Sequence, residues 1–249
     1  DAIDGYKRAE LVDPRNPVML YDASQTYYLL RDWKGAADAM DLALALALAL
    51  APESITIKIQ RAYVPFFSTG TTAAIKAALA TIPADTDPDG TVTYAHWDVS
   101  LIDRDFDAAR KAVAACRVDT ITTPDGAPLP KIYLQAYIAL MQGNEAEAQA
   151  GFETALPALE KTVRESSDDP ARHAHLGLLY ALMGRKEDAL REGRRAVDLK
   201  PISTDAIDGA IMETFLALIY ARVGMPDDAI PLLERILTRP SGVNYPVIA

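Results

Sequence analysis

The chain has 249 residues, of which 50% are hydrophobic and 24% charged, with 35 acidic against 25 basic side chains. The net charge of −10 opposes a phosphate backbone or an anionic membrane surface, so we expect neither nucleic acid nor a membrane as the partner. The single cysteine, Cys116, excludes an intramolecular disulfide and a four-cysteine metal site, and we expect it to be a buried, inert thiol.

The longest apolar run, Leu42–Ala51, is too short to cross a bilayer, and no targeting segment is visible. These features and the lone cysteine favour a cytoplasmic location. The chain opens abruptly at Asp1, as a piece of a longer protein would.

A spacing pattern returns about every 34 to 41 residues along the chain. A turn residue is followed five positions later by Ala, and a second small or apolar residue comes seven positions after that. A repeat of this length indicates a solenoid of stacked helical units, whose function lies on an extended surface rather than in a catalytic pocket. The pattern reads Arg31, Ala36, Ala43; Arg104, Ala109, Cys116; Gly143, Ala148, Ala155; Gly184, Ala189, Ala196; and Gly224, Ala229, Ile236.

One segment has the fullest set of repeat residues: His173, Leu176, Gly177, Tyr180, Gly184, Ala189, Ala196 and Pro201. With these spacings it resembles the tetratricopeptide repeat, although Gly193 stands where the family has a large aromatic residue. The resemblance implies an all-α fold, a right-handed superhelical solenoid of antiparallel helix pairs. It also implies that the first helix of each pair lines a concave groove.

Carried along the chain, the resemblance predicts one solenoid over residues 1–249, with about thirteen helices. An orphan second helix at 1–14 precedes six repeats. The weakest is 53–86, which carries Phe66, Gly70, Ile75 and Ile82. The repeats are 17–52, 53–86, 91–120, 129–166, 170–202 and 207–240.

Departures from the period carry further predictions. The alternating Leu–Ala run from Leu42 to Ala51 lacks β-branched residues, so we expect a second helix lengthened by about one turn rather than a strand. Segments 83–90 and 120–130 are rich in Pro, Asp, Thr and Gly and are predicted to be loops. Pro157 either starts a new helical segment or kinks a long helix, and Asp107 is expected to cap a helix.

Catalytic, cofactor and metal motifs are not apparent in the sequence. His173 and His175 are two residues apart and point in nearly opposite directions on a helix, so they cannot chelate one metal. We expect His173 to fill a packing position, while His175 can face the groove. Asp85, Asp87 and Asp89 alternate, but the downstream Glu of a calcium loop is absent, which favours an ordinary solvated loop.

The family's groove positions map onto a set that is rich in tyrosine. Tyrosines offer apolar faces with polar tips and suit an extended peptide, although tyrosines at helical spacing more often pack in a core. The predicted peptide-binding residues are Tyr21, Gln25, Tyr28, Phe67, Tyr94, Asp98, Tyr133, Tyr137, His175, Phe215 and Arg222.

The leading hypothesis is therefore a non-enzymatic scaffold that binds a protein or peptide in its groove. The final two repeats resemble repeat tails of bacterial multidomain signalling proteins, which implies a docking or sensory arm. An alternative is a self-association module, in which residues 1–14 or 42–50 pair with another copy. An enzyme with an unrecognised site is a remote alternative.

Overall fold

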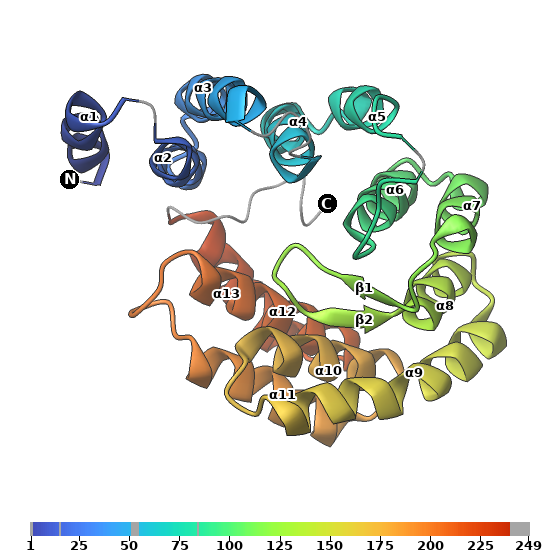
Figure 1. Cartoon of the computed structure of the whole chain (residues 1–249). Coiled ribbons are helices and arrows are strands. Elements are labelled where there is room, and N and C mark those ends of the chain that lie inside the picture. The colour runs from blue at the N-terminus through green and yellow to red at the C-terminus, as the bar shows by residue number, and fades with distance from the viewer. Residues whose placement is uncertain (1, 15, 51–54, 84, 240–249) are drawn as a thin grey trace. The chain divides into compact units, whose positions relative to one another are not determined.

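The computed structural model describes residues 2–14, 16–50, 55–83 and 85–239 (Figure 1). In these ranges it contains thirteen α-helices and one two-stranded sheet, which confirms an all-α helical-repeat fold. The chain divides into two compact units, unit 1 up to Pro83 and unit 2 over residues 84–239. The boundary falls at the start of the linker predicted over residues 83–90. None of the described helices combines the length and apolar character needed to cross a bilayer.

Unit 1 is a succession of helices in which each packs on the next one along the chain. The predicted orphan helix at the start packs against the first helix of the following pair. The weakest predicted repeat also forms a helix pair, with Gly70 at its turn. The helices are α1 (Ala2–Val12), α2 (Pro17–Leu29), α3 (Trp33–Leu50), α4 (Ile55–Thr69) and α5 (Ala73–Leu79).

The alternating Leu–Ala run is helical, as predicted. It forms the end of α3, which has 18 residues, and the predicted end of this helix near Pro52 falls outside the described residues. Leucine and alanine lose little conformational freedom in a helix, so the local sequence favours the helix over a strand despite the alternation.

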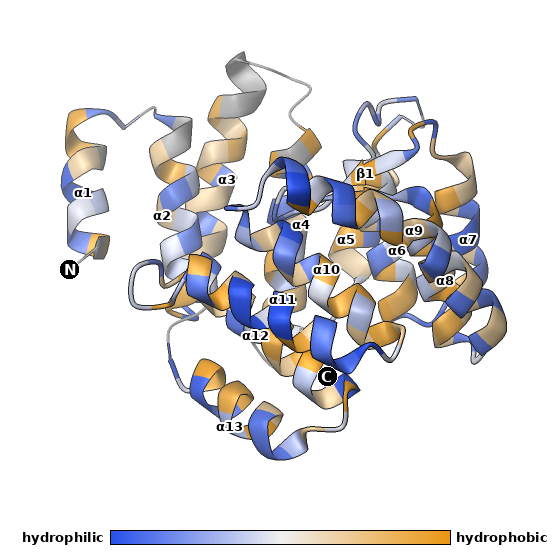
Figure 2. Ribbon diagram, turned by 90° about the horizontal axis from the view of Figure 1, so that it is seen from below, coloured by the Kyte–Doolittle hydropathy of each residue, from blue (hydrophilic) through white to orange (hydrophobic). Residues whose placement is uncertain are grey.

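Unit 2 contains four helix pairs, and within each pair the two helices pack against each other. The second helix of the third pair consists mainly of hydrophilic residues (Figure 2) and buries a stripe of small residues, Ala189, Gly193 and Ala196. The pairs are α6 (Thr91–Ile102) with α7 (Phe106–Ala115), α8 (Lys131–Met141) with α9 (Glu145–Glu165), α10 (Pro170–Leu182) with α11 (Lys186–Leu199), and α12 (Asp208–Arg222) with α13 (Pro226–Leu237).

Small residues allow the helices of the third pair to approach closely. A Cβ atom added to Gly177 would lie 2.9 Å from the backbone nitrogen of Gly193 on the facing helix. Ala189 and Ala196 are fully buried in the same contact. Because an added Cβ would lie this close to the facing backbone, a larger side chain at Gly177 would force the helices apart.

The residues that anchor the sequence period share one backbone conformation. Arg31 and Arg104 have φ of 58°, and Gly143, Gly184 and Gly224 have φ of 78°, 74° and 74°. Each follows the first helix of a pair and closes its end in the left-handed region, which glycine adopts without strain and other residues do not. The repeat pattern therefore records a recurring left-handed turn.

The prediction of a loop at 120–130 is wrong in part, because this segment forms a β-hairpin. Strand β1 (Thr120–Thr122) pairs with the antiparallel strand β2 (Pro128–Pro130), and Ile121 lies opposite Leu129. β-Branched residues favour the first strand, and the Pro-Asp-Gly sequence at 124–126 favours the turn, with Gly126 at φ 84°. Below, "the hairpin" means residues 120–130.

Two other local predictions are settled by the structure. Pro157 lies inside a single continuous helix, α9, which extends to Glu165. The cap of α7 is Asp105 rather than Asp107, because the Asp105 carboxylate accepts a hydrogen bond from the Ala108 amide at 3.0 Å. Asp107 lies in the first turn instead, where a negative charge favours the helix dipole.

The turn conformation yields a test with two opposite outcomes. We expect Arg104→Gly to raise the free energy of unfolding by up to about 1 kcal/mol, because it removes the strain of a left-handed non-glycine residue. Gly184→Ala should lower it by about 1 kcal/mol, and since no atom lies within 4 Å of the added Cβ, that loss reports on the backbone alone. Urea denaturation measures both, and a shift of both variants in the same direction would contradict the assignment.

Candidate functional site

The predicted groove residues are divided between the two units. In unit 1, Tyr21, Gln25 and Tyr28 lie on α2 and Phe67 lies on α4, and all four are half-buried. The rings of Tyr28 and Phe67 are 4.7 Å apart, and Tyr28 also meets Trp33 at 5.6 Å. These aromatic residues therefore pack one helix pair of unit 1 against the next.

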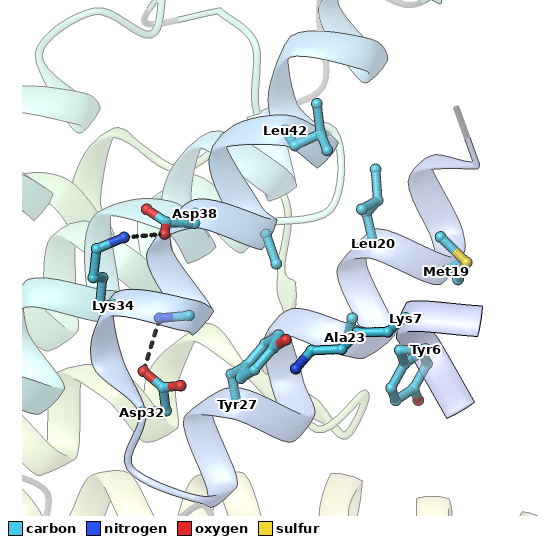
Figure 3. Close-up of a pocket in the computed structure, with 12 residues that line it drawn as sticks. Tyr6, Lys7, Met19, Leu20, Ala23, Tyr27, Asp32, Lys34, Asp38 and Leu42 are labelled. Carbon is cyan, nitrogen blue, oxygen red and sulfur yellow. Dashed lines mark hydrogen bonds and ion pairs between the residues drawn. The ribbon is translucent and has the colours of Figure 1, made fainter. Parts of the chain in front are cut away.

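Unit 1 also contains an open hollow of about 400 Å³ between α1, α2 and α3 (Figure 3). Its charged rim is engaged within the unit, because Lys34 pairs with Asp38 and the Gly35 amide donates to Asp32. None of the predicted groove residues lines it. The lining residues are Tyr6, Lys7, Met19, Leu20, Ala23, Tyr27, Asp32, Lys34, Gly35, Asp38, Ala39 and Leu42.

In unit 2 the predicted tyrosines converge on Trp97 of α6. Its ring lies 5.3 Å from Tyr94 and 5.6 Å from Tyr137, and its indole N–H donates to the Leu134 carbonyl at 3.2 Å. Tyr133 is 3% exposed and packs against Phe152 at 5.7 Å, so it supports this surface from inside. Burial raises the pKa values of Tyr94 and Tyr133 well above 10.0, which keeps both hydroxyls neutral.

The tip of the hairpin is joined to α10 by a nearly buried ion pair. The Nε2 atom of His175 lies 3.0 and 3.2 Å from the two carboxylate oxygens of Asp125, and the side chains are 8% and 17% exposed. Burial alone would raise the pKa of Asp125, but the charge of His175 and hydrogen bonds from His175, Thr123 and the Ala127 amide outweigh it and lower this pKa to about 2.

The base of the hairpin is fixed at the amino-terminal ends of α6 and α8. A Cβ atom on Gly90, which precedes α6, would lie 2.7 Å from Ile121, and Lys131 begins α8 directly after β2. Ile121 and Leu129 are 0% and 2% exposed. With its tip on His175, the hairpin therefore lies along the amino-terminal halves of these first helices, beside α8 and α10 in Figure 1.

The carboxyl-terminal halves of the same helices carry the other predicted residues. Asp98 and Tyr137 are half-buried there, and Arg222 is exposed at the end of α12. Burial raises the pKa of Tyr137, while the positive charge of Arg222 opposes this rise, so the two side chains act on each other. Phe215 stays near the hairpin side, with its ring 4.8 Å from His175.

A second open hollow, of about 470 Å³, lies at this end of unit 2. We call it the Arg222 hollow. It is formed by the ends of α8, α10 and α12 and the start of α9, and Arg222 is the predicted groove residue that lines it. The lining residues are Leu140, Glu145, Ala146, Ala148, Gln149, Phe152, Leu182 and Arg222.

The hairpin does not offer a suitable edge for strand addition. Residues 128 and 130 of β2 are both proline, and proline has no N–H to donate to a further strand. On β1, the Thr122 amide already donates to the Asp89 carbonyl at 3.0 Å. A partner on this surface must therefore be held through side chains.

His173 has a structural role, and its predicted packing position is confirmed. It is 6% exposed, and its ring nitrogens lie 2.6 Å from the Glu192 carboxylate and 3.0 Å from the Ser167 carbonyl. Two acceptors around one ring favour the imidazolium, and the Glu192 contact raises the pKa of His173 despite burial. The side chain thereby ties α10 to α11 and to the preceding loop.

Asp87 and Asp89 accept hydrogen bonds from backbone amides at the start of α6. Both oxygens of Asp87 accept amide hydrogen bonds at the start of α6, from Val92 at 2.9 Å and Thr93 at 3.0 Å, and Asp89 accepts one from Thr91. They act as helix caps. Within the described ranges no group of three or more His, Cys, Asp or Glu side chains is placed to hold a metal ion.

Stacked antiparallel helix pairs with small residues at their contacts define an all-α helical-repeat protein. The family model "Tetratricopeptide repeat" matches residues 140–203, from the end of α8 through α11, so this part of the chain is similar to that family. This match includes the segment with the fullest repeat pattern. No curated protein matches the sequence.

One solved structure supports the helical-repeat fold, and two others are similar at a lower level. The crystal structure of yeast Tom70 has a TM-score of 0.52 and 16% identity, and the alignment covers 94% of this chain but 46% of that one. YrrB, titled "a TPR protein with an unusual peptide-binding site", has 14% identity over 93% and 90% of the two chains with a TM-score of 0.30. MamA has 14% identity over 88% and 89% with a TM-score of 0.28. The last two similarities are too weak to carry an argument.

The buried ion pair gives a prediction about the hairpin. We expect Asp125→Asn to lower the free energy of unfolding by about 2 kcal/mol near neutral pH, because the carboxylate is stabilised in the folded chain. The folded pKa of about 2 lies below the ordinary value of 3.8. The ionised form therefore contributes fully above about pH 4 and loses its effect as the pH falls toward 2.

Urea denaturation of wild type and Asp125→Asn between pH 3 and pH 7 measures this difference. The matched control is Asp119→Asn at the base of the hairpin, an exposed residue that should change stability by less than about 0.5 kcal/mol. Equal stability of wild type and Asp125→Asn at neutral pH would show that the contact does not hold the hairpin.

Proposed function

We propose that the protein is a non-enzymatic scaffold that binds a protein or peptide segment on the first helices of unit 2. The observation that supports this most is that the ends of α8 and α12 meet at one hollow, which Leu140 and Arg222 both line, while the half-buried Tyr137 lies one turn earlier on α8 with its ring 5.6 Å from Trp97. Tyrosine, tryptophan and arginine dominate the energetics of protein interfaces, because they combine large apolar area with directed polar groups.

The hairpin limits where such a partner can lie. It already lies against the amino-terminal parts of α6, α8 and α10, with its base near Gly90 and Lys131 and its tip on His175. The partner surface is therefore the carboxyl-terminal halves.

Tom70 is a longer chain than this one, and within a longer protein the surface would serve as a docking or sensory arm. The resemblance of the last two repeats to bacterial signalling proteins supports that role.

A self-association function has one supporting observation. Leu11 and Val12, at the end of α1, are 86% and 87% exposed. Large apolar side chains that protrude next to each other can pair with another copy. Light scattering across a range of concentrations tests this alternative, and a molecular mass that stays at one chain would remove it.

Amide hydrogen exchange tests the scaffold proposal. Peptides selected from a random phage-displayed library against the whole chain serve as the partner. We expect bound peptide to slow exchange in residues 134–141 and 216–222, because these segments form the open half of the surface. The second helices α7, α11 and α13 are the internal control and should not change. Protection confined to those second helices, or the absence of any selected peptide, would contradict the proposal.

A further inference from the structure

Apolar side chains form part of the lining of the Arg222 hollow. Leu140 and Leu182 come from the ends of α8 and α10, and Phe152 comes from α9, with Ala146 and Ala148 beside it. The volume of the hollow, about 470 Å³, lies within the range of about 300–1,000 Å³ that is usual for ligand sites. An apolar side chain of a partner that entered it would be removed from water, which favours binding.

The rim of the hollow carries a positive charge that the described part of the chain does not neutralise. Arg222 is exposed, and no described residue forms a hydrogen bond or an ion pair with it. A guanidinium beside apolar walls is less well hydrated than one in open water, and its planar N–H groups match a carboxylate in a bidentate pair. The ligand chemistry that complements Arg222 is therefore a carboxylate.

An acidic side chain, Glu145, also lines the hollow. It is the first residue of α9, where its negative charge interacts with the positive end of the helix dipole. No ion pair joins it to Arg222 in the described part of the chain, so the guanidinium is the group that a partner's acid can satisfy.

The surface continues beyond the hollow toward Tyr137. Tyr137 lies about one turn before Leu140 on α8, is half-buried, and has its ring 5.6 Å from that of Trp97. An isolated small molecule in the hollow would leave this half-buried row uncovered. A segment of polypeptide extends from the hollow along the row, and this continuity favours a peptide as the occupant.

We propose that the Arg222 hollow binds a protein segment in which a bulky apolar side chain lies next to an acidic residue. The apolar side chain occupies the space between Leu140, Phe152 and Leu182, and the carboxylate pairs with Arg222. This inference rests on the proposed scaffold function and names the chemistry of its partner. The fixed hairpin keeps such a segment to the end of unit 2 that is opposite Asp125.

Peptides from the random phage-displayed library, selected on the whole chain, test the inference. We expect the selected sequences to share Asp or Glu within two positions of Leu, Phe, Ile or Met. Isothermal titration should show that Arg222→Glu weakens their binding about tenfold or more, because an attractive charge pair becomes repulsive. Peptides that carry Lys in place of the acid should bind Arg222→Glu better than wild type.

Lys111→Glu is the matched control, since Lys111 is an exposed cation on α7 and its substitution changes the net charge equally. We expect it to leave the affinity within about twofold. Equal affinity of the peptides for wild type and Arg222→Glu would overturn this inference, and so would a consensus sequence without an acidic residue. In either case, slowed hydrogen exchange on the first helices in the presence of peptide would still support the scaffold proposal. Failure to select any peptide would overturn both. Thermal unfolding of each variant confirms that the fold is retained.

Discussion

The contact between the Asp125 carboxylate and the His175 imidazole joins two residues 50 positions apart and determines which part of the unit 2 surface the hairpin covers. It anchors the tip of the hairpin on α10, while Ile121 and Leu129 fix the base. The Asp125 carboxylate is tolerated away from water because His175 lies within hydrogen-bond distance of both its oxygens and Thr123 and Ala127 add hydrogen bonds to it. Without these partners the carboxylate would be a buried, uncompensated charge.

This contact divides the first helices of unit 2 into two halves. The amino-terminal halves are covered by the chain's own hairpin, and the prolines of β2 prevent further strand addition there. The carboxyl-terminal halves remain, with an aromatic row and the Arg222 hollow. The surface that we propose for a partner is therefore shorter than the predicted groove, and in the described part of the chain Arg222 on this surface forms no ion pair.

The sequence predicted the repeats well, because their signals are local and recur. The left-handed turns at Gly143 and Gly184 and the small residues facing Gly177 follow from spacing alone. The sequence did not predict the hairpin, because each of its strands has only three residues and because the Pro, Asp and Gly residues of the segment are typical of loops. The Thr-Pro-Asp-Gly sequence was a turn signal between two strands.

The candidate site was predictable only in part, because contacts between residues far apart in the sequence determine it. Family positions predicted that His175 faces the groove, but its side chain is buried against Phe215 and contacts Asp125, which no helical periodicity could place beside it. Tyr133 is a second residue whose environment the sequence did not predict. Its spacing matched a surface position, and packing against Phe152 buries it instead. Long-range contacts, rather than local propensity, decide which groove residues stay accessible.

The most direct test of this account is native-state hydrogen exchange of residues 118–131 in the chain without any partner. The account predicts that the Thr123 amide, which donates to the Ala127 carbonyl at 3.0 Å, is protected to a degree similar to the amides of α8, and that Asp125→Asn removes this protection. Exchange of this segment at the rate of an unstructured chain in the wild type would contradict it, because the whole groove would then be open to a partner.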